Sequence, residues 1–324
     1  MALVEVRDLK KYFKTPRGTV HAVDGVTFDI EAGTTMGVVG ESGCGKSTLG
    51  RTMIHLNEST AGKIIFDGKD VTHLEGADMR KFREDVQFIF QDPFSSLNPR
   101  KTVRETIMEP LLLSKRFNKQ QLEEETDRLM DLVGVEQRLR MAYPHELDGG
   151  RRQRVGIGRA LALNPKFIVC DEPVSALDVS IQAQILNLLV DLQDKYGIAY
   201  MFITHNLSVV RHISDNICVM YLGQLVEQCS IKDLFEQQLH PYTKALLSAV
   251  PSTNIHQKRE RIILKGELVS PIDPKPGCRF APRCPYACEE CHKCNPELRE
   301  ILPGHKVACH RVEEINGITV CDAK

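Results

Sequence analysis

The sequence has no long apolar run, no excess of either charge and no repeated or low-complexity segment. No stretch reaches the roughly 18 to 20 apolar residues that a membrane-spanning helix requires. The opening residues, MALVEVRDLK, lack the basic and then apolar pattern of a secretion signal. Basic residues number 42 and acidic residues 43, and this balance does not support a protein that coats nucleic acid. We therefore expect a cytoplasmic protein, alone or docked on a membrane partner.

The 324 residues, of which 42% are hydrophobic, suffice to bury a full core. Short β-branched runs such as TTMGVV, VQFIF, FIVCD and AYMFITH alternate with helical patterns such as SIQAQILNLLVDLQDKY, which predicts an α/β fold with a largely parallel sheet. The opening segment alternates polar and apolar residues, which indicates antiparallel strands beside that sheet. Residues from about 92 to 165 lose the strand pattern and predict a helical subdomain.

The amino-acid composition changes near residue 250, after which proline, glycine and cysteine are more frequent and leucine and isoleucine less so. We place one domain at residues 1–250 and an extension, the tail, at residues 251–324. Without a secretion signal, clustered cysteines favour a metal or iron–sulfur site over disulfides. Seven of the eleven cysteines lie in the tail, namely Cys278, Cys284, Cys288, Cys291, Cys294, Cys309 and Cys321.

A glycine-rich stretch, GESGCGKST, follows a strand-like run and precedes a helical one. This context is that of a phosphate-binding loop, although a plain glycine-rich turn is the alternative. Glycines turn backbone N–H groups toward a phosphate, Lys46 neutralises its oxygens, and Ser47 can bind Mg²⁺. The residues expected to bind ATP here are Gly40, Ser42, Gly43, Cys44, Gly45, Lys46, Ser47 and Thr48.

Further polar residues stand at the ends of other expected strands. FIVCDEP ends in Asp171, a candidate Mg²⁺ ligand, and Glu172, a candidate base for the attacking water. Gln91 and His205 follow VQFIF and AYMFIT, at strand ends where ligands of open α/β sheets bind. An acidic pair alone is usually a solvated loop and a lone histidine is usually structural. Because the chain also has the phosphate loop, we interpret both the acidic pair and the histidine as functional.

These elements, in this order, resemble the nucleotide-binding subunits of ABC transporters, and the resemblance covers nearly the whole chain. It implies that Gln91 is the glutamine loop and a Mg²⁺ ligand, and that His205 is the switch histidine. It assigns Asp178 of SALD to the D-loop. Tyr12 stands where the family stacks an aromatic ring on adenine, although Phe13 is adjacent.

Several longer segments are similar to the ATPase subunits of dipeptide and oligopeptide importers, among them QDPFSSLNPR, HPYTKALLSAVP and the cysteine-rich tail. The resemblance implies a peripheral protein on the cytoplasmic face of the membrane. Its partners would be a second homologous ATPase subunit, forming a heterodimer, two membrane permease subunits and an extracellular peptide-binding protein. No nucleic acid is implied.

The family's signature, Leu-Ser-Gly-Gly-Gln, is altered in this chain to Leu147, Asp148, Gly149, Gly150 and Arg151. Aspartate caps a helix as well as serine does. A carboxylate about 4 Å from a phosphate oxygen, however, would cost on the order of 4 kcal/mol at an effective dielectric near 20. Arg151 brings a compensating cation. We expect the composite site that uses this signature to be impaired, with tolerated sequence drift as the alternative.

In the tail, Cys278, Cys284, Cys291 and Cys309 match the family's spaced cysteines, which in some members hold a [4Fe–4S] cluster. Four thiolates also suit zinc, and free thiols are a third interpretation. Cys288 and Cys294 are additional to the family pattern, so the ligand set could shift.

Two rival functions remain open at this point. A soluble ABC ATPase of DNA repair or translation would normally carry a coiled-coil insertion or two cassettes in one chain, and neither is present. A regulatory subunit that binds ATP with little turnover is the second rival, because the signature is altered.

Overall fold

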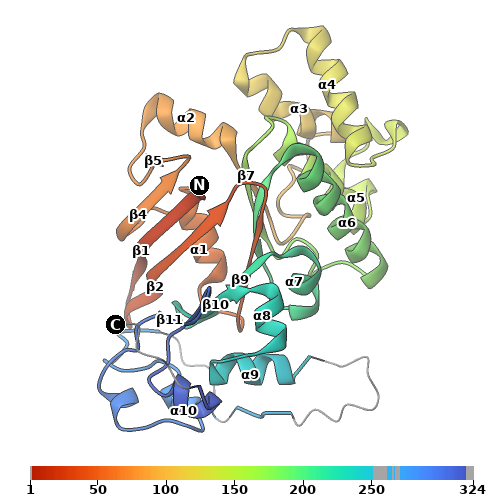
Figure 1. Ribbon diagram of the computed structural model, residues 1–324. Helices are drawn as coiled ribbons and strands as arrows, with labels where there is room; N and C mark the ends of the chain where they lie inside the picture. Colours follow the sequence, from red (N-terminus) through yellow and green to blue (C-terminus); the bar gives the residue numbers. More distant parts are fainter. Residues whose placement is uncertain (1, 251–260, 265, 267–270, 319–324) are drawn as a thin grey trace. The chain divides into compact units, whose positions relative to one another are not determined.

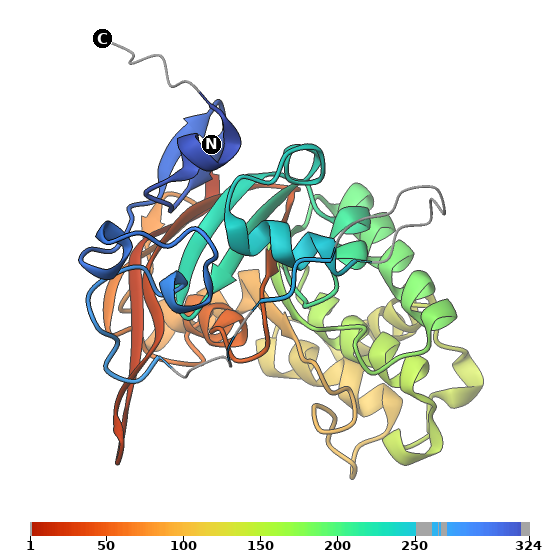
Figure 2. The ribbon, with the colours of Figure 1, turned by 90° about the horizontal axis from the view of Figure 1, so that it is seen from below.

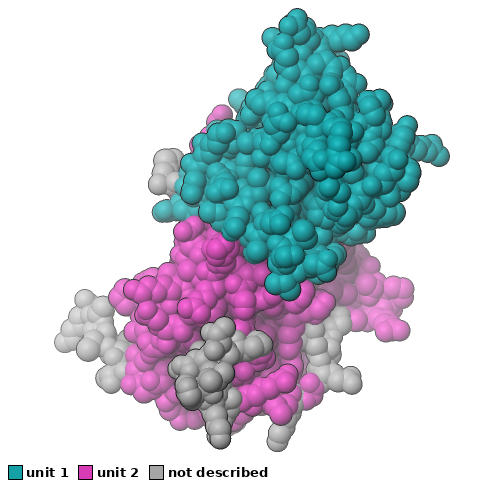
Figure 3. Space-filling view, turned by 90° about the vertical axis from the view of Figure 1, so that its right-hand side faces the viewer, with its two compact units in different colours: residues 1, 31–34, 73–202 teal, residues 2–30, 35–72, 203–324 magenta. Residues whose placement is uncertain are grey.

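The computed structural model describes residues 2–250, 261–264, 266 and 271–318, and the chain divides into two compact units (Figure 3). Unit 1 comprises residues 31–34 and 73–202, and unit 2 comprises residues 2–30, 35–72 and 203–324. Cys321 of the tail lies outside the described residues. Each unit is assembled from segments that are distant in the sequence.

An antiparallel sheet forms one part of unit 2, with the strand order β2-β1-β4-β5 (Figure 1). Along β2, residues alternate between buried and exposed from Val26 to Glu31, as expected when one sheet face is solvated. The predicted antiparallel strands are thus confirmed. The strand bounds are β1 Ala2–Thr15, β2 Gly18–Glu31, β4 Ala61–Phe66 and β5 Lys69–Asp70.

Within unit 2, the strands of the second sheet have the order β11-β12-β10-β9-β3. The fully buried β3 pairs in parallel with β9, and the remaining pairs are antiparallel. The tail contributes the hairpin at the edge, because β12 pairs with β10 and its His305 Nε2 lies 2.7 Å from the buried Glu227 Oε1. The bounds are β3 Thr35–Val39, β9 Asn216–Tyr221, β10 Gln224–Ser230, β11 Arg299–Leu302 and β12 His305–Val307.

The tail also joins the antiparallel sheet, since Ile272 bridges Val20 of β2. Figure 2 shows the blue ribbon of the tail passing beside the red strands of this sheet. Phe280 of the tail is buried against Tyr221 and Tyr242, with ring centroids 5.3 and 5.5 Å away. Helices and 3₁₀ turns of unit 2 are α1 Lys46–Met53, α7 Leu207–Ile213, α8 Ile231–Glu236, α9 Pro241–Ser248, η3 Ala281–Arg283, η4 Glu290–His292 and α10 Val312–Asn316.

Unit 1 contains the strands β6 Val86–Ile89 and β7 Phe167–Asp171, which pair in parallel, and β8 Ala199–Ile203, whose last residue belongs to unit 2. Every residue of β7 and β8 is buried, which explains their continuous apolar runs. Capping boxes begin α3 and α4. The helices are α2 Gly76–Asp85, α3 Val103–Ser114, α4 Lys119–Leu132, η1 Gln137–Leu139, η2 Pro144–Glu146, α5 Gly149–Leu161 and α6 Val179–Tyr196.

The predicted α/β fold is confirmed, and α3, α4 and α5 fall within the stretch expected to be helical. Across the described residues, the structure contains no helix long and apolar enough to span a bilayer.

Candidate nucleotide site

The glycine-rich loop of unit 2 connects β3 to α1, as its sequence predicts. Gly40 and Gly45 have φ angles of 155° and 105°, and an added Cβ would lie 2.2 Å from Met220 O and 2.0 Å from Ala22 O, respectively. Only glycine fits these two positions without displacing neighbouring backbone. Gly45 is also the N-cap residue of α1 and offers no capping side chain. The first-turn N–H groups of α1 are therefore left without a capping side chain, which is the arrangement that suits an anion.

Lys46 begins α1, and its side chain folds back over the loop. Its buried Nζ donates hydrogen bonds of 2.9 Å to the carbonyl oxygens of Gly40 and Glu41, and lies 3.7 Å from Cys44 Sγ. Burial raises the pKa of the Cys44 thiol, so this cysteine remains protonated and packs as a small apolar side chain. The loop thus combines helix N–H groups with one ammonium, which is the chemistry that binds a polyphosphate.

Tyr12 of β1 lies in a polar network of unit 2. Its ring stacks on His21 at 3.9 Å, and its hydroxyl donates to the carboxylate of Asp24. Burial opposes ionisation of Asp24, but hydrogen bonds from Tyr12 and His21 and the charge of Arg279 outweigh it and lower the pKa of that carboxyl. Tyr12 is therefore held in a fixed orientation, as a residue that stacks on a base must be.

In unit 1, β7 ends at the fully buried Asp171, and Glu172 follows. Glu172 has a φ of 46°, a left-handed conformation that costs energy in residues with a side chain. Gln91 Nε2 donates a 2.9 Å hydrogen bond to Glu172 Oε2. Two predicted site residues separated by 81 positions therefore meet. The bond orients the carboxylate that sequence reasoning assigned to the attacking water.

Two further predicted residues stand next to helices. His205 follows β8 and is exposed, one residue before Asn206, whose side chain caps α7 by accepting from Ser208 N–H at 3.0 Å. Asp178 is the exposed N-cap residue of α6, but its side chain makes no capping bond. Unit 2 thus holds the phosphate loop, Tyr12 and His205, and unit 1 holds the remaining predicted nucleotide residues.

The altered signature of unit 1 forms the beginning of α5. As predicted, Asp148 is the N-cap, and its Oδ1 accepts from Arg151 N–H at 2.7 Å. The Arg151 guanidinium is 3.0 Å from Asp148 Oδ2 and 3.0 Å from Glu136 Oε1. Gly149 and Gly150 occupy the first two positions of the helix. The carboxylate that replaces the family serine is therefore already paired with the arginine that replaces the family glutamine.

The four predicted cysteine ligands all lie among the described residues of the tail. Cys278 N–H donates to Cys291 O at 2.7 Å, and burial, reinforced by the charges of the other three thiols, raises the pKa of Cys309 to about 12. Among the described residues, no three of these four sulfur atoms lie within 4.8 Å of one another. Four thiolates on one zinc ion would lie about 3.8 Å apart, given a Zn–S distance near 2.3 Å. The additional Cys288 lies nearer, with its Sγ 3.5 Å from Cys291 Sγ.

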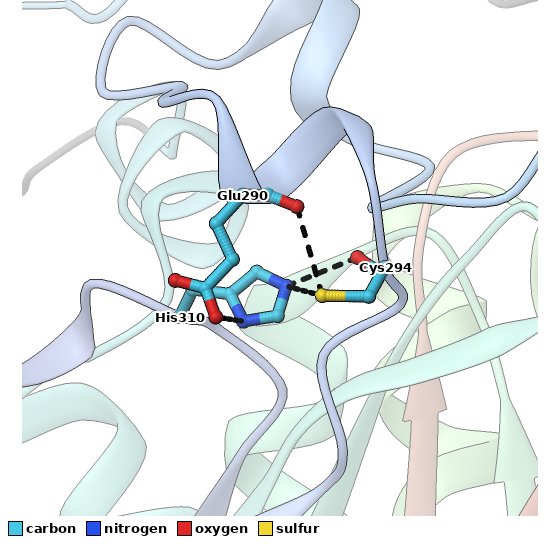
Figure 4. Close-up of side chains that lie close together, drawn as sticks. All are labelled: Glu290, Cys294 and His310. Atoms are coloured by element: carbon cyan, nitrogen blue, oxygen red, sulfur yellow. Dashed lines mark hydrogen bonds and ion pairs between the residues drawn. The ribbon is translucent and has the colours of Figure 1, made fainter.

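A second group of metal-binding type in the tail consists of Glu290, Cys294 and His310, whose candidate ligand atoms all lie within 4.8 Å of one another (Figure 4). His310 Nε2 lies 3.0 Å from Cys294 O, and because a carbonyl only accepts, Nε2 is the donor in this contact. His310 Nδ1 lies 3.7 Å from Glu290 Oε1. Sequence reasoning missed Glu290 and His310, because 20 positions separate them and no spacing rule links them.

Comparison with known proteins gives a consistent result. Residues 23–175 match the ABC transporter family, and residues 226–291 match the family described as oligopeptide/dipeptide transporter, C-terminal region. The oligopeptide transport ATP-binding protein AppF of Bacillus subtilis is 51% identical over 318 residues, covering 95% of this chain and 97% of AppF. The di/tripeptide transport ATP-binding protein DppF of Pseudomonas aeruginosa is 45% identical, covering 97% of this chain and 99% of DppF.

Solved structures show the same fold. The ATP-binding cassette MJ0796, in its dimeric post-hydrolysis state bound to ADP and Pi, matches with a TM-score of 0.65 and 28% identity, covering 70% of this chain and 98% of that one. The protein cbiO1 of Clostridium perfringens, part of the ABC transporter complex cbiONQ, matches with a TM-score of 0.65 and 27% identity, covering 73% of this chain and 92% of that one.

Proposed function

Because the chain belongs to the family of ATP-binding subunits of oligopeptide and dipeptide ABC transporters, we propose that it hydrolyses ATP to drive the import of short peptides. It is an ATPase of the ABC type. The observation that carries a catalytic role for this chain is the hydrogen bond from Gln91 to Glu172, which orients the carboxylate of the candidate base. The left-handed backbone of Glu172 is a second feature of a kind that gathers at active sites.

In the proposed mechanism, the first turn of α1 and Lys46 bind the β- and γ-phosphates, and Tyr12 stacks on the adenine. Glu172 accepts a proton from the attacking water, and His205 contacts the γ-phosphate. Ser47, Asp171 and Gln91 would hold Mg²⁺, which when bound neutralises charge on the phosphate oxygens.

The partners in this proposal are a second homologous ATPase subunit, two membrane permease subunits and an extracellular peptide-binding protein. The chain would then sit on the cytoplasmic face of the membrane. ATP turnover in vesicles that hold the assembled transporter tests the proposal. Turnover that rises when peptide-loaded binding protein is added supports it, and ATP binding without turnover would favour the regulatory alternative.

The altered signature supports an asymmetric pair of ATP sites. The Asp148 carboxylate caps α5 and binds Arg151. Unlike the family serine, it has no hydroxyl to donate to a γ-phosphate held by the partner. The Arg151 cation is shared with Glu136, which limits its compensation of that charge. We therefore place the poor site where this signature meets the partner's phosphate loop, and the main hydrolytic site at this chain's own loop.

Replacing both altered residues, Asp148→Ser with Arg151→Gln, tests this asymmetry. It should raise ATP turnover of the assembled transporter several-fold. The matched control is Arg138→Gln, which removes an exposed arginine that pairs with the same Glu136. Unchanged turnover and unchanged nucleotide affinity in the double variant would contradict the asymmetric arrangement.

For the tail, we propose a [4Fe–4S] cluster held by Cys278, Cys284, Cys291 and Cys309, with zinc as the alternative. The backbone contact between Cys278 and Cys291 and the effect of the other three thiols on Cys309 support a metal centre that uses these four residues. Free thiols are the remaining alternative. The Glu290, Cys294 and His310 group offers a different place for zinc.

Metal analysis of anaerobically purified protein separates these alternatives. A cluster predicts brown protein with near-stoichiometric iron, which Cys284→Ser should remove and Cys294→Ser should leave in place. Colourless protein whose zinc is lost in Cys294→Ser and His310→Ala would instead identify the second group. Folded protein without metal would contradict both.

A further inference from the structure

Glu41 is the first non-glycine residue of the phosphate loop, and three groups of unit 2 hold it. Its N–H donates to Tyr242 Oη at 2.8 Å, and its carbonyl accepts from Lys46 Nζ at 2.9 Å. Its carboxylate receives two hydrogen bonds from the tail, from Arg283 Nη1 to Oε2 at 2.6 Å and from Arg283 Nη2 to Oε1 at 3.1 Å. The tail is thus directly attached to the loop expected to bind phosphate.

Arg283 itself is held firmly in place. Its side chain is 11% exposed, and the guanidinium lies 6.0 Å from the centre of the Tyr221 ring. The pKa of Arg283 is raised, mainly by its hydrogen bonds to Glu41. The preceding Phe280 is buried between Tyr221 and Tyr242, which fixes the short η3 turn that ends at Arg283. A bidentate pair on such a rigid support fixes the orientation of its partner.

A second arginine of the tail reaches the other end of the candidate nucleotide site. Arg279 donates to the carboxylate of Asp24 and to the carbonyl oxygen of Leu222. Asp24 in turn holds the hydroxyl of Tyr12, the candidate adenine-stacking residue. Gly223 continues the connection, since its carbonyl accepts from Asp24 N–H at 2.8 Å and its N–H donates to Cys44 O at 2.8 Å.

We propose that Arg283 is a positioning residue for ATP binding, which fixes Glu41 and neutralises its carboxylate beside the phosphate loop. In the same proposal, Arg279 binds the carboxylate of Asp24, which in turn fixes the hydroxyl of Tyr12. An unpaired carboxylate at the loop would repel the phosphates of ATP. The tail is then a structural part of the nucleotide site. This inference does not depend on the peptide substrate, on the signature or on any metal in the tail.

The test is a double-mutant cycle on the purified full chain, read as the dissociation constant of a fluorescent ATP analogue with Mg²⁺. Arg283→Gln should weaken binding about fivefold, which corresponds to the upper end of the energies measured for partly exposed ion pairs. In the Glu41→Gln background, the same change should weaken binding less than twofold, because no carboxylate remains to be neutralised. Arg283→Lys, which keeps the charge but loses the fork geometry, should fall between wild type and Arg283→Gln.

The matched control is the Arg299 and Glu313 pair, an ion pair that lies wholly within the tail. Arg299→Gln should leave nucleotide binding unchanged. An equal loss on Arg283→Gln in both backgrounds, or a loss no larger than that of Arg299→Gln, would overturn the proposal. If Arg283→Gln lowers the unfolding midpoint, the charge-reversed pair Arg283→Glu with Glu41→Arg decides the question. It should bind the analogue more tightly than Arg283→Glu alone, and weaker or equal binding would overturn the proposal.

Discussion

The phosphate loop of unit 2 and the signature loop of unit 1 use the same local device, in which glycines lead into the first turn of a helix. They differ at the N-cap. Gly45 gives α1 no capping side chain, and Lys46 adds a cation. Asp148 caps α5 with a carboxylate that is also paired with Arg151. The first helix start is open to an anion, and the second already holds a carboxylate of its own. The residue before each helix thus decides whether its first N–H groups are available to an anion.

The largest effect on ATP binding should come from removing the cation that distinguishes the two loops. Lys46→Ala should weaken ATP binding about ten- to a hundredfold, because charged hydrogen bonds to phosphate oxygens are lost. Equilibrium binding of a fluorescent ATP analogue measures this. Lys63→Ala, an exposed lysine of β4, is the control, and a similar loss in both variants would show that Lys46 has no special role.

The next prediction concerns stability and not binding, and it tests whether the backbone of the phosphate loop requires glycine. Gly45→Ala should destabilise the fold by at least about 3 kcal/mol, since a Cβ would meet Ala22 O at 2.0 Å in a left-handed conformation. Gly43→Ala, at a φ of 78° with open space around it, should cost only about 1 kcal/mol. Urea unfolding of both variants compares them. Equal losses would mean that the close approach at Gly45 does not constrain the loop.

The smallest effect concerns the cap of α5. Asp148→Ala should lower the free energy of unfolding by about 1 kcal/mol, because the capping bond to Arg151 N–H is lost. Asp148→Ser keeps a capping oxygen and should stay near the wild-type stability. The same urea titrations measure this pair. A loss in Asp148→Ser as large as in Asp148→Ala would show that the ion pair with Arg151, and not the cap, stabilises this turn.

Local patterns in the sequence were sufficient for the elements that carry the expected chemistry. The strand before Asp171, the glycine loop before α1 and the capping role of Asp148 each depend on a few neighbouring residues, and the structure has each of them. The predicted strand VQFIF forms β6, which ends at Ile89, one residue short of that run.

Contacts between residues that are far apart in the chain could not be predicted from the sequence. Glu41 and Arg283 are 242 positions apart, and neither residue type nor spacing links them. The contacts of the tail are of this kind, because its hairpin extends the sheet of β9 and β10, and its arginines bind residues of the first fifty. Such contacts depend on how the sheets bring the segments together, which hydrophobic periodicity does not encode.

The central claim, that this chain's own phosphate loop serves the main hydrolytic site, is tested most directly in the assembled transporter. Glu172→Gln should lower peptide-stimulated ATP turnover about a hundredfold or more, the loss typical of a general base, while ATP still binds. The same change at the corresponding glutamate of the partner ATPase should lower turnover less than about threefold. Turnover in Glu172→Gln that stays at half of the wild-type rate or above would contradict the claim.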